Sequence, residues 1–163
     1  MNANGHAIVF GAESGQAIVY SNVVVANNTA VDCLGATPAF GLNPNNYDIS
    51  YRDSWYVNNL AYNCRSANNP PITSVGPTNG LFIGYNYTWA GNDGGAGVVS
   101  NQVAASTGCN DAGTCSAQVQ FQGYTELSPT NNLALSPSDT ACRGQGTNLT
   151  AGGITLGPNI GAY

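Results

Sequence analysis

The chain has 163 residues, a length that fits one domain, and its three basic and eight acidic residues give a net charge of −5. Without a basic patch, nucleic acid and anionic membranes are poor partners, and no run approaches the roughly 18 apolar residues of a membrane-spanning helix. Only 7% of the residues are charged, but 42% are hydrophobic, which indicates a packed chain whose polar surface comes from Asn, Ser, Thr and Gly.

A gapless repeat of 31 residues organises the N-terminal part of the chain. Residues 16–33 (QAIVYSNVVVANNTAVDC) align with residues 47–64 (YDISYRDSWYVNNLAYNC). The identical positions are Ile18/Ile49, Tyr20/Tyr51, Asn27/Asn58, Asn28/Asn59, Ala30/Ala61 and Cys33/Cys64. Within the repeat, apolar runs of four residues such as Ala17–Tyr20 and Val23–Ala26 alternate with Gly, Asn and Ser, which is typical of short strands separated by turns.

Short strands with a period near 30 residues predict an all-β parallel β-helix, a solenoid with about three strands per coil. We expect one domain over residues 1–163, with coils at about 5–33, 34–64, 65–106 and 107–163. Irregular Gly-, Asn- and Pro-rich excursions are expected at about 67–79, 91–97 and 108–116.

Equivalent residues of successive coils are expected to stack about 4.8 Å apart. Asparagines at such positions can pass amide hydrogen bonds along the axis, so either Asn27/Asn58 or Asn28/Asn59 is expected to form a ladder, with Asn101 as a third rung. Cys33 and Cys64 would also stack, either as buried thiols or as a disulfide between coils.

Cys109 and Cys115 bracket a loop of Asn, Asp, Ala, Gly and Thr. This spacing favours a local disulfide, and with it an oxidising compartment. Two reduced cysteines are the alternative. A zinc site is disfavoured because the chain has no CxxC motif and a single histidine, His6.

The richest cluster of chemically active residues is Asp48, Arg52 and Asp53. In a strand over residues 47–52, Asp48 and Arg52 share the outward face and the apolar side chains share the inward one. Arg52 can hold a sugar carboxylate through two hydrogen bonds, and Asp48 or Asp53 can act as acid or base or hold a cation. Glycoside hydrolysis requires two carboxyl groups about 5–5.5 Å or 6.5–9.5 Å apart. The alternative is a solvated Asp–Arg pair.

Aromatic side chains give a second candidate site, a platform against which sugar rings can stack. Its members are Trp55, Tyr56, Tyr85, Tyr87 and Trp89. The alternative is that they face inward, as alternation along a strand requires of half of them. Asp93 lies in a Gly-rich loop that could hold calcium, but one carboxylate makes a weak site, and no other cofactor or metal is indicated.

The C-terminal region carries a resemblance to a known family. It reads Leu-Ala-Leu-Ser-Pro-Ser-Asp-Thr-Ala-Cys over residues 133–142 and Gly-Pro-Asn-Ile-Gly-Ala-Tyr over residues 157–163. These segments resemble the "SPAIDAG…DIGAYE" end of secreted bacterial right-handed parallel β-helix proteins of the pectate-lyase-like superfamily. The chain departs from that pattern at Cys142 and Asn159, which argues against a carboxylate or calcium role there. The resemblance implies a carbohydrate-facing extracellular or cell-surface protein and singles out no reaction.

Three functions follow as hypotheses, and whether the protein is an enzyme stays open. The first is a β-helix module that engages polysaccharide or the cell surface through aromatic and Asn/Thr-rich faces. The second is a polysaccharide hydrolase or lyase that uses Asp48, Arg52 and Asp53. The third is a structural solenoid that self-associates through its N-terminal coil, which begins near Gly5 without a capping helix.

Overall fold

The computed structural model describes residues 8–11, 16–33, 40–42, 48–64, 72–74, 80–89, 118–151 and 153–161. These residues form an all-β structure with no helix. The strands are β1 (Ile8–Phe10), β2 (Ile18–Ser21), β3 (Val24–Ala26), β4 (Thr29–Val31), β5 (Phe40–Leu42), β6 (Ile49–Arg52), β7 (Ser54–Val57), β8 (Leu60–Tyr62), β9 (Ile72–Ser74), β10 (Leu81–Gly84), β11 (Tyr87–Trp89), β12 (Phe121–Gly123), β13 (Asn132–Leu135), β14 (Leu149–Ala151) and β15 (Ile154–Leu156).

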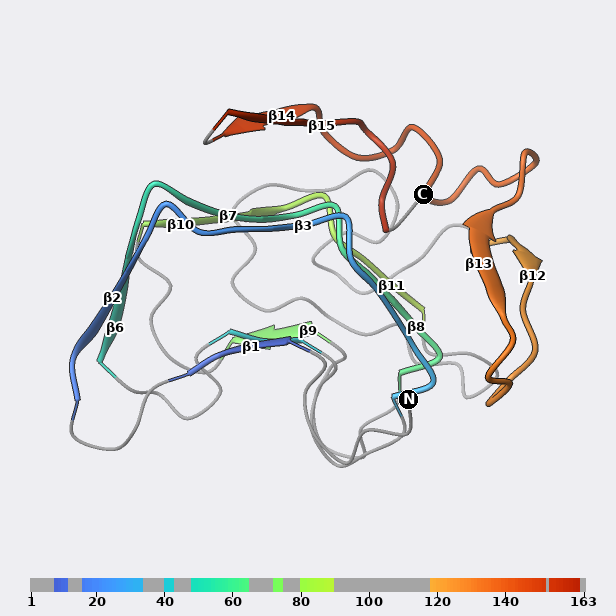
Figure 1. The fold of residues 1–163 in the computed structure, drawn as a ribbon, viewed down its shortest axis with the longest axis horizontal. Helices are drawn as coiled ribbons and strands as arrows, with labels where there is room; N and C mark the ends of the chain where they lie inside the picture. Colours follow the sequence, from blue (N-terminus) through green and yellow to red (C-terminus); the bar gives the residue numbers. More distant parts are fainter. Residues whose placement is uncertain are drawn as a thin grey trace.

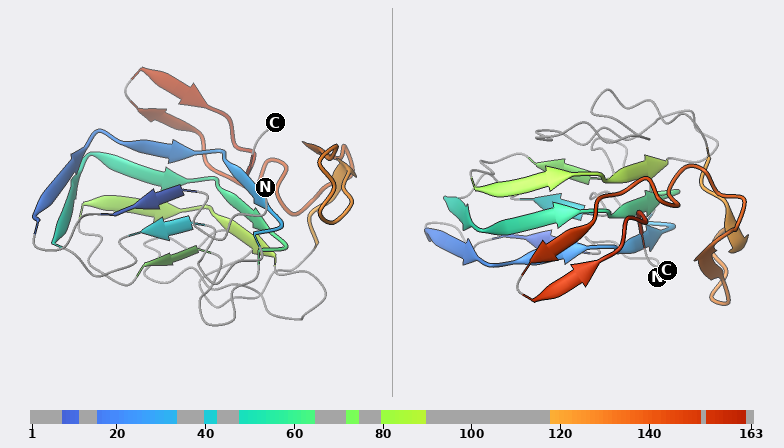
Figure 2. Two further views of the ribbon diagram at one scale, coloured as in Figure 1. Left: turned by 60° about the horizontal axis from the view of Figure 1, so that its bottom comes forward. Right: turned by 90° about the horizontal axis from the view of Figure 1, so that it is seen from above.

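The described strands between residues 8 and 89 make three passes through a set of small parallel sheets. The first pass contains β1–β4, the second β5–β8 and the third β9–β11. Sheet A has the order β1-β5-β9, sheet B pairs β2 with β6, sheet C has the order β3-β7-β10, and sheet D has the order β4-β8-β11. Viewed end on, strands of successive passes superpose around a common interior (Figure 1). Figure 2 shows the passes one beside the next, from blue through teal to green.

The register confirms the 31-residue repeat between the first two passes. Ile18 pairs with Ile49 and Tyr20 with Tyr51, and the two tyrosine rings stack with their centroids 5.8 Å apart. The third pass is shorter, because Leu81 pairs with Ser54 at an offset of 27 residues. The segment 67–79, predicted as a loop, contains a strand, β9, which pairs with β5 and continues sheet A.

Left-handed residues mark the corners between strands, five positions apart. They are Asn22, Asn27 and Asp32 in the first pass and Asp53, Asn58 and Asn63 in the second. Asn and Asp adopt positive φ more readily than other side-chain-bearing residues, so this spacing bends the chain between sheets at little cost. In the third pass the corresponding corners are Gly80 and Tyr85.

An asparagine ladder runs through all three passes. The Asn28 side-chain amide donates to Asn59 Oδ1 at 2.9 Å, and that of Asn59 donates to Asn86 Oδ1 at 3.0 Å. Asn59 and Asn86 are fully buried. The prediction of an Asn28/Asn59 ladder is confirmed, with Asn86 as its third rung, while Asn101 lies outside the described residues.

The described residues form two hydrophobic cores. The inner core lies in the interior enclosed by the parallel sheets and contains inward side chains of all three passes, among them Ile49, Tyr56 and Ile83. The outer core lies on the outward face of sheet D, where Leu60, Tyr62 and Tyr87 pack against the C-terminal residues Val119, Leu135, Ala141, Cys142 and Ile160. The central strand of this sheet, β8, is therefore buried on both faces.

The described C-terminal residues form antiparallel hairpins, β12–β13 and β14–β15, instead of continuing the parallel sheets as expected for a coil over 107–163. Figure 2 shows both hairpins outside the stack of passes. The Asn27 amide donates to Asn159 O at 2.6 Å. Asn58 donates to Thr147 O at 2.8 Å and accepts from Thr147 N at 2.9 Å. Asn27 and Asn58 therefore bind the C-terminal segment, whereas Asn28 and Asn59 form the ladder.

Replacing Gly80 by alanine is expected to destabilise the protein by at least about 3 kcal/mol. Its φ is +81°, and a Cβ atom there would lie 2.1 Å from the Tyr51 carbonyl oxygen. Gly153→Ala is the matched control, because its φ is +79° but no atom lies within 4 Å. We expect the control to cost only about 1 kcal/mol of backbone strain. Urea unfolding measures both, and equal costs would contradict the close approach of the passes at Gly80.

Asn59→Ala is expected to lower the free energy of unfolding by about 3 kcal/mol, because it leaves buried partners unsatisfied on both neighbouring passes. Asn59 donates to Val25 O and Asn86 Oδ1, and its own Oδ1 accepts from Asn28. Asn28→Ala, at the half-buried end of the ladder, should cost about 1 kcal/mol. Chemical denaturation compares the two, and a larger loss for Asn28→Ala would be inconsistent with a ladder centred on Asn59.

Stability is expected to fall in alkaline solution as the core tyrosines ionise. Burial, and to a lesser extent neighbouring Tyr20, raises the pKa of Tyr51 to about 12. The pKa of a tyrosine in the unfolded chain is about 10. The stability that un-ionised Tyr51 contributes to the fold is therefore complete below pH 10 and is lost as the pH rises through 12. Unfolding free energies measured from pH 8 to 12 should decline less steeply for Tyr51→Phe than for the unchanged protein. Parallel declines would refute this role of Tyr51.

Candidate functional site

The outward face of sheet C carries a row of apolar side chains, Val24, Trp55 and Phe82, which we call the Trp55 row. The three residues are in register across β3, β7 and β10, and each is half-buried. Adjacent strands lie about 4.8 Å apart, so the row runs across the strands as a continuous apolar strip. The alternate residues Tyr56 and Ile83 face inward and are fully buried.

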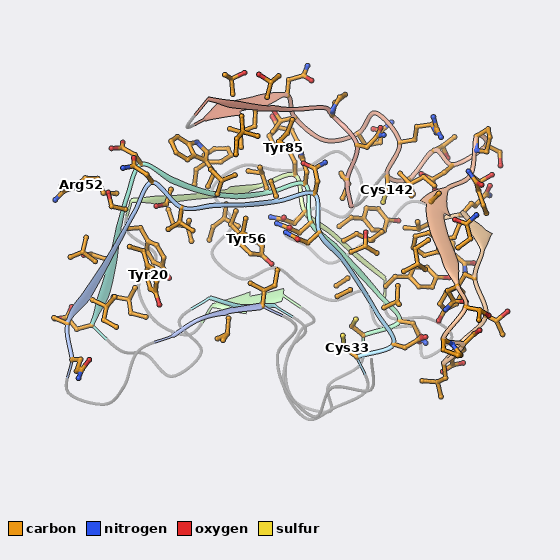
Figure 3. The ribbon with its side chains drawn as sticks, in the orientation of Figure 1. Tyr20, Cys33, Arg52, Tyr56, Tyr85 and Cys142 are labelled. Atoms are coloured by element: carbon orange, nitrogen blue, oxygen red, sulfur yellow. The ribbon has the colours of Figure 1, made fainter. Side chains whose placement is uncertain are left out.

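A corner with exposed charges borders this row. β6 ends at Arg52, Asp53 adopts a φ of +47°, and β7 begins at Ser54. The buried Ser54 hydroxyl donates to Arg52 O at 2.8 Å and accepts from Val23 N at 3.2 Å, which fixes the corner to the first pass. Arg52 and Asp53 are exposed, and Arg52 points away from the body of the molecule (Figure 3). Arg52 therefore presents an exposed guanidinium at the corner between sheets B and C.

Asp48 lies at the far end of β6 from this corner. It is exposed, as Ser50 and Arg52 are, while Ile49 and Tyr51 are buried, so the expected alternation of this strand is observed. The extended strand separates the Cα atoms of Asp48 and Asp53 by about 16 Å. Even if the two side chains pointed toward each other, their carboxyl groups would lie farther apart than the spacing of about 5–9.5 Å that glycosidase carboxyl pairs require. The strand thus holds the two carboxylates apart.

The five aromatic residues predicted as a platform are not gathered on one surface. Tyr56 is buried in the inner core, where burial raises the pKa of its hydroxyl, and Tyr87 is buried in the outer core. Alternation turns Tyr56 inward, and the C-terminal segment covers Tyr87. Trp55 and Tyr85 are half-buried, and Tyr85 projects from its corner toward the β14–β15 hairpin in Figure 3. Trp89 pairs in register with Tyr62, and its side chain lies outside the described residues.

Phe82 is a member of the row that the aromatic prediction missed. The 31-residue offset does not align Phe82 with Trp55, because the third pass is shorter and the true offset is 27. The signal that could have found it is the alternation over residues 81–84, which places Phe82 on the opposite face from Leu81 and Ile83.

Two buried carboxylates, Asp32 and Asp139, hold the C-terminal segment in place. Asp32 accepts from the Tyr124 hydroxyl at 2.5 Å, from Leu127 N at 2.8 Å and from the Asn63 amide at 2.7 Å. Asp139 accepts at 2.8–2.9 Å from three backbone N–H groups, those of Gln120, Cys142 and Arg143. With these contacts, both carboxylates serve the fold as acceptors of hydrogen bonds.

Of the remaining predicted site residues, the structure describes only some. Cys33, Cys64 and Cys142 are buried free thiols, whereas Cys109, Cys115, His6 and Asp93 lie outside the described residues. Within the described ranges, no group of three or more His, Cys, Asp or Glu side chains lies together as metal ligands. The same part of the chain contains no helix long and apolar enough to cross a membrane.

No protein-family model, curated protein or solved structure matches the chain.

Proposed function

We propose that the chain is a right-handed parallel β-helix module of a secreted protein and that it binds polysaccharide along the Trp55 row. The in-register parallel pairing of three passes supports the solenoid, since each pass buries its inward side chains against the next. A right-handed path is inferred because crossovers between parallel strands of one sheet are almost always right-handed. The tail resembling secreted pectate-lyase-like proteins supports the extracellular setting.

The observation that carries the binding proposal is the in-register pair of outward aromatic residues, Trp55 and Phe82. A half-buried aromatic side chain keeps a surface in contact with solvent while its packing holds it in one orientation. Such rigid aromatic surfaces, together with a few polar groups, are typical of ligand sites. The row crosses the strands, so a linear chain of sugars lying along it would meet Trp55 and Phe82 in succession.

The charge distribution narrows the class of polysaccharide. The protein carries a net charge of −5, which disfavours a dense polyanion such as a fully charged uronate polymer. Arg52, exposed at the bordering corner, can hold an occasional carboxylate. Neutral or sparsely carboxylated polysaccharides therefore fit the row best.

The two other functions have weaker support. Hydrolysis by paired carboxylates is disfavoured because β6 holds Asp48 and Asp53 too far apart. Self-association is favoured by one observation: among the described strands, β1, β2, β3 and β4 each lie at the edge of their sheet. We therefore keep a structural, self-associating solenoid as the second candidate function.

Electrophoresis in gels containing neutral or sparsely carboxylated polysaccharides tests the proposal. We expect retarded migration of the unchanged protein and at least about a tenfold loss of affinity for Trp55→Ala, the size of effect that a central aromatic contact produces. Val19→Ala is the matched control, because Val19 is also apolar and outward but lies on sheet B with 60% of its surface exposed.

Two results would overturn the binding proposal. One is the absence of retardation in every polysaccharide, and the other is equal retardation of Trp55→Ala and the unchanged protein. New reducing ends that disappear in Asp53→Asn would replace it with an enzymatic function.

A further inference from the structure

The pairing of the first two passes continues beyond the ends of β4 and β8. Asp32 N donates to Tyr62 O at 3.2 Å, and the Asn63 amide donates to Asp32 Oδ1 at 2.7 Å. The next residues on the two passes are Cys33 and Cys64, so the 31-residue register makes them neighbours.

The sulfur atoms of the two cysteines lie against the same stretch of backbone. Cys64 Sγ contacts the carbonyl oxygen of Ala30, on the first pass, at 3.5 Å, and Cys33 Sγ contacts that of Val31 at 3.8 Å. Both thiols belong to the inner core. The spacing of about 4.8 Å between adjacent strands lies within the Cα separations, about 4.4–6.8 Å, that a disulfide accepts.

The two thiols are chemically unequal. A hydrogen bond with the Cys64 thiol lowers the pKa of Cys33, while the same contact, together with burial, raises the pKa of Cys64. Cys33 is therefore the thiol that forms a thiolate more readily and attacks first.

We infer that Cys33 and Cys64 form a disulfide linking the first pass to the second when the chain folds in the presence of a disulfide oxidant such as oxidised glutathione. The Cys33 thiolate attacks one glutathione sulfur and expels a glutathione thiolate, which takes up a proton. The Cys64 thiolate then attacks the Cys33 sulfur of the mixed disulfide and expels the second glutathione. The two cysteines lose two electrons and two protons, and one glutathione disulfide becomes two glutathione thiols. The exchange takes place once the first two passes have paired and the thiols are in contact, and completed burial afterwards shields the bond.

Cys142 provides an internal comparison. It lies in the outer core, away from the Cys33/Cys64 pair, and burial raises the pKa of its thiol. Its described surroundings are the apolar residues of that core and Asp139, whose carboxylate accepts from its backbone N–H. We expect it to remain a thiol under the same conditions.

The test is to refold the full chain with glutathione disulfide, denature it without reductant, block free thiols with N-ethylmaleimide and map the peptides by mass spectrometry. Peptides containing Cys33 and Cys64 should be joined and unblocked, while the Cys142 peptide should be blocked. Reduction should lower the melting temperature by about 10 °C, as expected for a bond that closes a loop of about 30 residues. The difference should vanish in the double variant Cys33→Ala, Cys64→Ala and persist in Cys142→Ala.

Blocked Cys33 and Cys64 peptides from the folded, oxidised protein would overturn the inference, and so would their linkage to any other cysteine. Peptide mapping of the unchanged chain gives this answer even if a variant fails to fold. The inference is independent of polysaccharide binding, which is measured separately on the outward face of sheet C.

Discussion

The structure depends on residues of successive passes stacking in register, because a three- or four-residue strand cannot bury its own apolar side chains. Each pass shields the next from water only if equivalent residues stack in register, as Ile18 does on Ile49. The asparagine ladder enforces that register. Asn59, fully buried, bonds to both neighbouring passes, and a slip of one residue would leave its amide without partners in the core.

The C-terminal segment decides which outward surfaces remain accessible. It packs on the outward face of sheet D and, through Asn27, Asn58 and Asp32, is fastened to the corners of the first two passes. Tyr87 thereby changes from an outward residue into a core residue. The β14–β15 hairpin lies alongside the outward face of sheet C (Figures 1 and 2), but Trp55 and Phe82 keep part of their surfaces exposed there, and the proposed binding surface is this exposed part.

The sequence predicted the local features that a repeat exposes directly. The offset of 31 residues, the alternation along residues 48–52 and the Asn28/Asn59 pair could all be read from aligned residue types, because stacking demands like residues at like positions. The third pass was not predicted correctly. Its offset of 27 residues hid the equivalence of Asn86 with Asn59 and of Phe82 with Trp55.

Burial by long-range packing was also beyond the sequence pattern. Nothing in the alternation of residues 81–88 shows that Val119 and Ile160 cover Tyr87, since those contacts join segments far apart in the chain. The separation of Asp48 from Asp53, by contrast, could be derived from the sequence. It follows from the rise per residue of the strand predicted between them.

Nuclear magnetic resonance of the asparagine side-chain amides tests the in-register stacking most directly. The amide protons of Asn59 should show through-space contacts to both Asn28 and Asn86 and should exchange slowly with solvent. Fast exchange of the Asn59 amide, or contacts that pair it with residues at other offsets, would contradict the stacking of passes on which the fold and the proposed binding surface both depend.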